Sequence, residues 1–342
     1  MSSGSSSSAT NGLHPHQDGS NHLNHAHHLN GFVDPTPHDQ KIIDYLYNYG
    51  FQRGEYADTV LVSVLSSCNL SNRVQRLPLK HVHQNTYRLH AIILSRSPFL
   101  VQLLSTSPQA QVGVPREIFV PVEREPEVTQ EGFAIALGYL YSSSSLKLIR
   151  PENARAVLAA GCMLGGMNDL CEFAYAICKR SISVDTIALW LEFVDAIPSP
   201  SSGADTPGPD LSPIRILGPY VQRLRDDVFH FLVVTLPNIL EIHATPESVP
   251  TTPENGREIL LQVFSRVPFD MFKAAIESPN FQIGSDQARY KFAKEAIEAR
   301  KHGIARGLEE TVVLAFGGGN FGTSAVHVTR KMRKRPLWKV NS

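Results

Sequence analysis

The spacing of apolar residues changes from strand-like to helical along this chain, and this change limits the folds that it can adopt. Asp58–Leu65 (DTVLVSVL) predicts a largely buried strand, Thr86–Leu89 a second short strand and Glu117–Val122 a third. Pro121 cannot donate a main-chain hydrogen bond, so we expect the third strand at an edge of the sheet. Elsewhere after His90 the apolar residues recur every three to four positions, as on the buried face of a helix. A few short strands followed by many helices predict an α+β fold.

A short amphipathic helix is expected before the first strand. Thr36 and Pro37 suit an N-cap and the first helical position, and Gly50 is a typical helix end. Between these residues the apolar side chains Ile42, Leu46 and Tyr49 fall on one face. This face must be buried against something else.

The helical part begins with an N-cap at Thr129 and runs to Tyr141. Two more helices follow, Pro151–Met163 and Asn168–Arg180. The pair Gly165-Gly166 between them is typical of a tight connection between helices, so these two helices are expected to form a hairpin.

Two segments are unsuited to regular structure. Residues 1–35 are rich in Ser and His and have few apolar residues, which predicts a disordered tail. Residues 198–213 contain five prolines and predict a linker or long surface loop. The expected organisation is therefore a first domain over 36–183, a helical domain over 184–302 that the linker interrupts, and a Gly-rich, basic tail over 303–342.

Composition excludes several functions. The 342 residues carry 32 Lys+Arg and 32 Asp+Glu, so the whole chain has no electrostatic preference for nucleic acid or an acidic membrane. Apolar runs such as Val312–Phe316 are far too short to cross a bilayer, and the first residues are unlike a secretory signal. Four cysteines, Cys68, Cys162, Cys171 and Cys178, are too few for a disulfide framework, and we expect reduced thiols in the cytoplasm or nucleus.

Residues 55–183 resemble a BTB/POZ domain in five successive elements. The family's "D-V" strand resembles Asp58-Thr59-Val60, its following histidine resembles His90, and its "V-L-x-S-x-x-F" segment resembles the run from Ile93 to Phe99. Its tyrosine-ended helix and its last helix pair resemble Val128–Tyr141 and Asn153–Cys178. The signature residues in this chain are Asp58, His90, Leu94, Ser97, Phe99, Tyr139, Leu140 and Tyr141. The resemblance implies a small sheet flanked by helical hairpins, with His90 as a packing residue at a strand end rather than a base.

The chain departs from this family pattern at two places. About twenty residues, Ser66–Asn85, replace the usual tight hairpin, which predicts an inserted loop or strand. After His90 the usual basic residue is Ala91. The charged pocket with which some relatives recruit transcriptional corepressors therefore lacks that residue.

The second half resembles the helical BACK domain that commonly follows BTB, over Val228–Leu240 and Val267–Ile297. Pro268 and Asp270 suit the start of one helix, and Asp286 suits the cap of another. On that second helix the pairs Lys291/Glu295 and Lys294/Glu298 are expected on the solvent side, opposite Ala288, Phe292 and Ala296. The resemblance and the residue pattern both predict stacked helical hairpins.

No pattern supports an enzyme or a cofactor. Gly317–Gly322 satisfies G-x-G-x-x-G after a strand-like run, Thr311–Phe316, but neither a long helix nor an acidic residue follows, so a Gly-rich loop is expected instead of a dinucleotide site. Cys162, Cys171 and Cys178 lack the spacing of a structural zinc site, and we expect them in the core. The histidines of the N-terminal tail, His22, His25, His27 and His28, either capture metal or only reflect biased composition.

Taken together, these patterns predict a non-enzymatic protein-interaction module without a cofactor or small-molecule substrate. The resemblance implies a homodimer that buries Ile42, Leu46 and Tyr49, and an adaptor role in which the end helices of the BTB unit dock a cullin scaffold for ubiquitin transfer. The alternative is a nuclear BTB regulator that acts through a basic segment. That segment, a nuclear-localisation or nucleic-acid patch or else a solvated tail, contains Arg330, Lys331, Arg333, Lys334 and Arg335.

Overall fold

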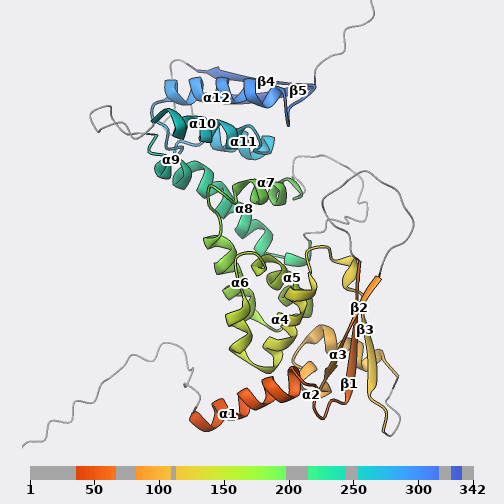
Figure 1. Cartoon of the computed structure of the whole chain (residues 1–342). Helices are drawn as coiled ribbons and strands as arrows, with labels where there is room; N and C mark the ends of the chain where they lie inside the picture. Colours follow the sequence, from red (N-terminus) through yellow and green to blue (C-terminus); the bar gives the residue numbers. More distant parts are fainter. Residues whose placement is uncertain are drawn as a thin grey trace, which may run out of the picture. The chain divides into compact units, whose positions relative to one another are not determined.

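The computed structural model describes residues 36–66, 82–108, 113–197, 215–242, 253–315 and 325–332 (Figure 1). The elements of the first half are α1 Pro37–Tyr45, η1 Leu46–Phe51, β1 Thr59–Ser66, β2 Val82–Leu89, α2 Ala91–Leu94, α3 Pro98–Thr106, β3 Arg116–Val120, η2 Val122–Arg124, α4 Gln130–Tyr141, η3 Ser143–Leu148, α5 Ala154–Leu164 and α6 Asn168–Arg180. Those of the second half are α7 Ile187–Asp195, η4 Arg215–Leu217, α8 Tyr220–His230, η5 Phe231–Thr235, α9 Leu236–Ile239, α10 Pro253–Phe264, α11 Phe269–Glu277, α12 Asp286–Lys301, β4 Leu308–Leu314 and β5 Val326–Met332. The expected N-terminal tail and the expected linker at 198–213 lie outside the described residues.

The first sheet has three strands in the order β2-β1-β3. β1 pairs with β2 antiparallel and with β3 parallel, and Leu61 stands opposite both Tyr87 and Ile118. Leu61 and Ile118 are buried, and the Tyr87 ring meets Phe133 of α4 edge-on at 6.1 Å between centroids, so this row faces the helices. The expected α+β organisation of the first half and the edge position of the third strand agree with this sheet.

Part of the expected insertion Ser66–Asn85 lengthens the hairpin of β1 and β2. β2 begins at Val82, four residues before the predicted start, and Ser66 pairs with Val82. Residues 67–81 lie outside the described part of the chain.

The leading helix begins as the sequence predicts. Thr36 Oγ1 accepts a hydrogen bond from the Asp39 amide (3.3 Å), and Asp39 Oδ2 accepts one from the Thr36 amide (3.0 Å), which is a reciprocal cap. These residues belong to the first of two compact units, 1–40, and the second unit spans 41–342. From Leu46 the helix widens to a π-helical turn and ends at Phe51, one residue beyond the predicted end at Gly50.

Helical hairpins follow the sheet. α4 begins after Thr129, whose Oγ1 accepts a hydrogen bond from the Gly132 amide at 3.1 Å. α4 packs on α5, and α5 packs on α6. The α5–α6 connection contains Gly165 and Gly166 at φ +69° and +71°, values that glycine adopts without strain. The first helix of this hairpin starts at Ala154, three residues after the predicted Pro151, while α6 has the predicted bounds.

The second half differs from the prediction in its helix caps and ion pairs. Ser285, not Asp286, caps α12, because its Oγ accepts a hydrogen bond from the Ala288 amide at 3.3 Å. The predicted pairs of Lys291 with Glu295 and of Lys294 with Glu298 are absent from the described residues. Glu295 instead pairs with Arg257 of α10 (2.6 Å), and Glu298 pairs with Lys301 (2.5 Å).

The expected tail over 303–342 contains two strands, β4 Leu308–Leu314, which overlaps the strand-like run Thr311–Phe316, and β5 Val326–Met332, which was not predicted. β4 and β5 form an antiparallel hairpin in which Leu308 stands opposite Met332. β4 packs on α12 and β5 packs on α11, and Val326 and Val328 are fully buried. This half is therefore not purely helical. Among the described residues, none of the helices has the length and apolar character that a bilayer crossing requires.

Candidate functional site

The outer face of the leading helix carries exposed apolar side chains. Ile42, Tyr45 and Leu46 are 47%, 51% and 37% exposed. The Tyr49 ring stacks on Tyr45 at 4.6 Å between centroids, and the Arg53 guanidinium lies 4.5 Å from the Tyr49 centroid. Three large apolar side chains and a clamped aromatic ring thus form one surface, which we call the leading-helix face and define as Ile42, Tyr45, Leu46 and Tyr49.

The opposite side of this helix is fixed to the first domain. Phe51 lies 5.3 Å from Tyr141 between ring centroids and 5.5 Å from Tyr47. A Cβ at Gly138 of α4 would come within 2.9 Å of Phe51 and 3.3 Å of Tyr47, so only glycine allows this close approach. The second half of the helix is therefore held by α4, and the leading-helix face stays outside.

His90, Asp58 and Tyr141, three of the signature residues, meet at the end of β2. The His90 amide donates to the Tyr141 hydroxyl (2.9 Å), which lies 3.0 Å from His90 Nδ1, and His90 Nε2 lies 2.9 Å from the Glu55 carbonyl oxygen. A carbonyl oxygen only accepts, so Nε2 carries the proton and Nδ1 accepts from the tyrosine. Burial raises the pKa of Tyr141, although the His90 amide partly opposes this. The histidine is thus a fully bonded structural residue.

The same cluster holds the start of α2. Asp58 Oδ1 accepts hydrogen bonds from the Ala91 amide (2.7 Å) and from Thr59 Oγ1 (2.8 Å). Ala91, where relatives have a basic residue, is the first residue of α2. Asp58 therefore joins the first strand to the helix that follows the second strand.

The other signature residues serve the core. Ser97 is buried, its Oγ donates to the Leu164 carbonyl at 2.5 Å, and it caps α3 by accepting from the Leu100 amide at 3.3 Å. Leu94, Leu140 and Tyr141 are buried, and Phe99 and Tyr139 are half-buried against the core. None of these contacts involves a group poised for catalysis.

Tyr56 adds an exposed aromatic side chain between the leading helix and β1. It is 86% exposed, and its backbone is in the left-handed region at φ +60°. That conformation costs a residue with a side chain roughly 1–2 kcal/mol. An aromatic ring that is held in solvent at such a cost is a candidate contact residue.

A charged and aromatic network that the sequence did not indicate joins α6 to α8. Glu172 accepts from Arg223 at 2.6 and 3.0 Å and from the Tyr220 hydroxyl at 3.0 Å. The Arg223 guanidinium lies 3.9 Å from the Tyr175 centroid, and the Tyr175 hydroxyl donates to Asp227 at 2.5 Å. The hydrogen bond from Arg223 lowers the pKa of Glu172. No residue spacing signals this pairing, because 51 residues separate Glu172 from its arginine.

A buried ion pair fixes the β4–β5 hairpin on α12. Arg300 and Glu310 side chains are 0% and 1% exposed, and Arg300 Nε donates to Glu310 Oε2 at 2.7 Å. Arg300 Nη1 also donates to the carbonyls of Phe264 (2.9 Å) and Val267 (2.6 Å). Arg330 donates to Glu310 Oε1 at 2.7 Å.

This network gives Arg330, a residue of the predicted basic patch, a role within the fold. Arg330 is an ion-pair partner of Glu310 and lies 4.0 Å from the Phe269 centroid, so it is a structural residue of β5. Lys331 is exposed on the same strand. Arg333, Lys334 and Arg335 lie outside the described residues. Arg330 is therefore engaged within the fold, and the basic patch stays a prediction for Lys331, Arg333, Lys334 and Arg335.

The predicted core cysteines are placed as expected for Cys171 and Cys178, which are buried on α6. Cys162 of α5 is half-buried, and its sulfur lies 4.0 Å from that of Cys171. Burial raises the pKa of Cys178 to about 12. No cluster of metal-ligating side chains occurs among the described residues. Cys68, the tail histidines His22, His25, His27 and His28, and Gly317–Gly322 lie outside these residues.

A small three-stranded sheet packed against helical hairpins is compatible with a BTB-like fold. The chain is 27% identical over 312 residues to BTB/POZ domain-containing protein 2 of Schizosaccharomyces pombe. The alignment covers 88% of this chain and 92% of that protein. No model of a known protein family matches the chain, and no solved structure matches it.

The similarity supports a BTB-type protein and therefore a protein-interaction module, a class that is generally not enzymatic. The chemistry of the signature residues agrees with that class. His90 and Asp58 use their hydrogen-bonding groups to hold the fold, and the exposed side chains of the first domain include large apolar and aromatic ones such as Ile42, Tyr45 and Tyr56.

Proposed function

We propose that this chain is a homodimeric BTB-type interaction protein whose leading-helix face packs against a second copy. The observation that carries the proposal is the exposure of Ile42, Tyr45 and Leu46 on a helix whose opposite side is already packed. A two-fold dimer uses the same patch on both copies, so each of these side chains is buried on both copies.

Burial of these side chains would contribute to association. Burying a fully exposed aliphatic side chain contributes about 1.5–3 kcal/mol. Ile42 and Leu46 are 47% and 37% exposed, so each adds roughly 1 kcal/mol per copy if the dimer covers it. Aromatic stacking between Tyr45 rings would add to this.

Light scattering coupled to size exclusion tests the dimer on the full chain. We expect twice the mass of one chain, and the mass of one chain for the double variant Ile42→Asp/Leu46→Asp. Ile239→Asp is the matched control, because Ile239 is 56% exposed on α9, outside the leading helix. A wild-type protein with the mass of one chain, or a double variant that still dimerises, would contradict the proposal.

We extend the proposal to an adaptor role in which helices at the end of the first domain dock a cullin scaffold. Phe173 of α6 supports it, since this ring is 40% exposed beside the network that joins α6 to α8. Co-expression with a cullin followed by affinity purification tests this role. We expect Phe173→Asp to lose the cullin and Ile239→Asp to retain it; equal recovery of cullin with both variants would count against the adaptor.

The alternative proposal is a nuclear regulator that acts through the basic segment. It has less support because Arg330 is engaged with Glu310, which leaves Lys331, Arg333, Lys334 and Arg335 to act. Salt-dependent retention of the full chain on DNA, lost when Arg333, Lys334 and Arg335 are changed to Ser, would favour it. Cytoplasmic or nuclear location is a proposal of the same kind, and microscopy of the tagged chain decides it.

A further inference from the structure

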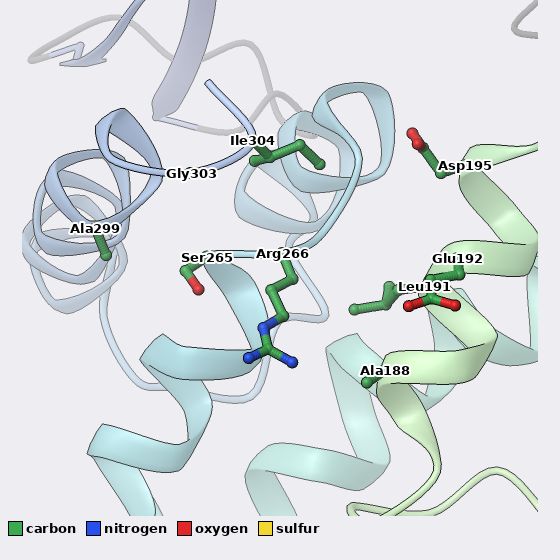
Figure 2. A pocket seen from close by; sticks show the side chains of 9 residues that line it. All are labelled: Ala188, Leu191, Glu192, Asp195, Ser265, Arg266, Ala299, Gly303 and Ile304. Carbon is green, nitrogen blue, oxygen red and sulfur yellow. The ribbon is translucent and has the colours of Figure 1, made fainter. Parts of the chain in front are cut away.

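A groove lies between α7 and the helices α10 and α12. Two adjoining hollows of about 360 and 310 Å³ share Ala188, Leu191 and Arg266. Each has the volume of a small ligand pocket. Figure 2 shows Leu191 projecting from α7 toward the opposite wall, where Arg266 and Ile304 lie. We call this hollow the α7 groove.

Three charged side chains that line the α7 groove have no partner among the described residues. Glu192 and Asp195 stand exposed on the α7 side, and Arg266 is exposed on the other. Across the described parts of the chain, the side chains of these three residues make no hydrogen bond or ion pair with another residue. Asp185 at the far end of the groove adds a third carboxylate, so the groove is acidic overall with one free guanidinium.

The end of β5 lies within a bounded distance of this groove. Met332 stands opposite Leu308, and Leu308 follows four residues after Ile304, which lines the groove. Four residues span at most ~14 Å, and a strand pair adds ~5 Å, so Met332 is at most ~20 Å from Ile304. The six residues from 333 to 338 can extend by ~20 Å. Residues 333–342 are therefore long enough to reach the groove.

The composition of residues 333–342 complements the groove. They include Arg333, Lys334, Arg335 and Lys339 and no acidic side chain, and the apolar pair Leu337-Trp338 interrupts the charges. Basic side chains suit the carboxylates of α7, the apolar pair suits the surface around Leu191 and Ile304, and main-chain carbonyls suit the five donors of Arg266.

We propose that residues 333–342 bind back into the α7 groove of the same chain. Leu337 and Trp338 fill the apolar part, and the basic side chains pair with Glu192 and Asp195. Binding covers the basic residues that the nuclear alternative requires, so the groove controls their exposure. This inference does not depend on the dimer or on the cullin.

Fluorine NMR of the full chain labelled with 5-fluorotryptophan tests the proposal. The chain has two tryptophans, Trp190 and Trp338, and Trp338→Phe assigns their signals. We expect the Trp338 signal to differ from that of a synthetic 333–342 peptide and to show a reduced H₂O/D₂O shift. The variant Glu192→Lys/Asp195→Lys should move it to the peptide position with a full solvent shift.

The matched control is Glu123→Lys/Glu152→Lys, which reverses two exposed carboxylates away from the groove. It should leave the Trp338 signal unchanged, and circular dichroism should show both double variants folded. A Trp338 signal identical to that of the peptide overturns the proposal. So does protection that persists in the groove variant, or protection lost on dilution, which would place the segment on a second copy.

Discussion

Replacing Glu310 by Gln tests whether the β4–β5 hairpin belongs to the folded core. The substitution keeps the shape of the side chain but removes the charge that faces Arg300, which is 0% exposed. Removing one partner of a buried ion pair typically costs about 3–5 kcal/mol, because the other charge is left uncompensated. Arg300 retains two carbonyl acceptors and lies 4.2 Å from the Phe272 centroid, so we expect the lower limit, about 3 kcal/mol.

The assay is guanidinium unfolding followed by circular dichroism, which gives the free energy of unfolding. Glu298→Gln is the matched control, since Glu298 pairs with Lys301 on the same helix but is 66% exposed. That substitution should cost less than about 0.5 kcal/mol. A second variant, Arg300→Met/Glu310→Leu, removes both fully buried charges and should be more stable than Glu310→Gln, because the one charge left without its partner, Arg330, is 27% exposed.

The effect of Glu310→Gln should also depend on pH. Burial by itself would raise the pKa of Glu310, but hydrogen bonds from Arg300 and Arg330 outweigh burial and lower it. A carboxylate with a lowered pKa in the folded state contributes stability that is present above its unfolded pKa and lost as pH falls through its folded pKa. The stability difference between wild type and variant should therefore shrink in acid. Equal stability of Glu310→Gln and Glu298→Gln at neutral pH would refute this reasoning.

Three further substitutions test the first domain, each by its thermal midpoint and its free energy of unfolding. Tyr141→Phe should cost about 1–3 kcal/mol, because it leaves the amide and ring nitrogen of the half-buried His90 without their partner; an unchanged midpoint would contradict the role of that hydroxyl. Gly132→Ala should cost about 1–3 kcal/mol, since the new Cβ would lie 2.7 Å from the main chain of Ala156, while Gly303→Ala, with its nearest neighbour at 4.0 Å, should change stability by less than about 0.5 kcal/mol. Ser97→Ala should cost about 1–2 kcal/mol through loss of a helix cap and a buried hydrogen bond; Ser97→Thr retaining that stability would support the hydroxyl as the cause.

Local signals predicted the first domain well. The cap at Thr129, the glycine turn between α5 and α6, and the bounds of α6 depend on residues within a few positions of one another. The resemblance singled out Asp58 and His90, and both side chains make hydrogen bonds within the first domain. It did not indicate how they act, because the Ala91 amide, the Glu55 carbonyl and the Tyr141 hydroxyl come from separate segments.

Contacts between distant segments explain the errors in the second half. Arg330 looked like part of a basic tail, because the carboxylate that neutralises it lies 20 residues earlier. Residues 326–329 alternate apolar and polar side chains, but so short a run does not predict a strand without its partner β4. The α7 groove likewise combines Glu192, Arg266 and Ile304 from three helical segments, and no motif joins them.

The β4–β5 hairpin that covers Arg300 also constrains the order in which this part of the chain can fold. Glu310 and Arg330, which complete the polar cluster around Arg300, follow helix α12 in the chain and are therefore synthesised after it. Until the hairpin has packed, the Arg300 guanidinium must stay hydrated, and the neighbouring residues Phe264 and Phe272 cannot pack around it. A chain in which the β4–β5 hairpin has not yet packed would therefore expose those rings, and exposed apolar surface of this kind favours aggregation and proteolysis.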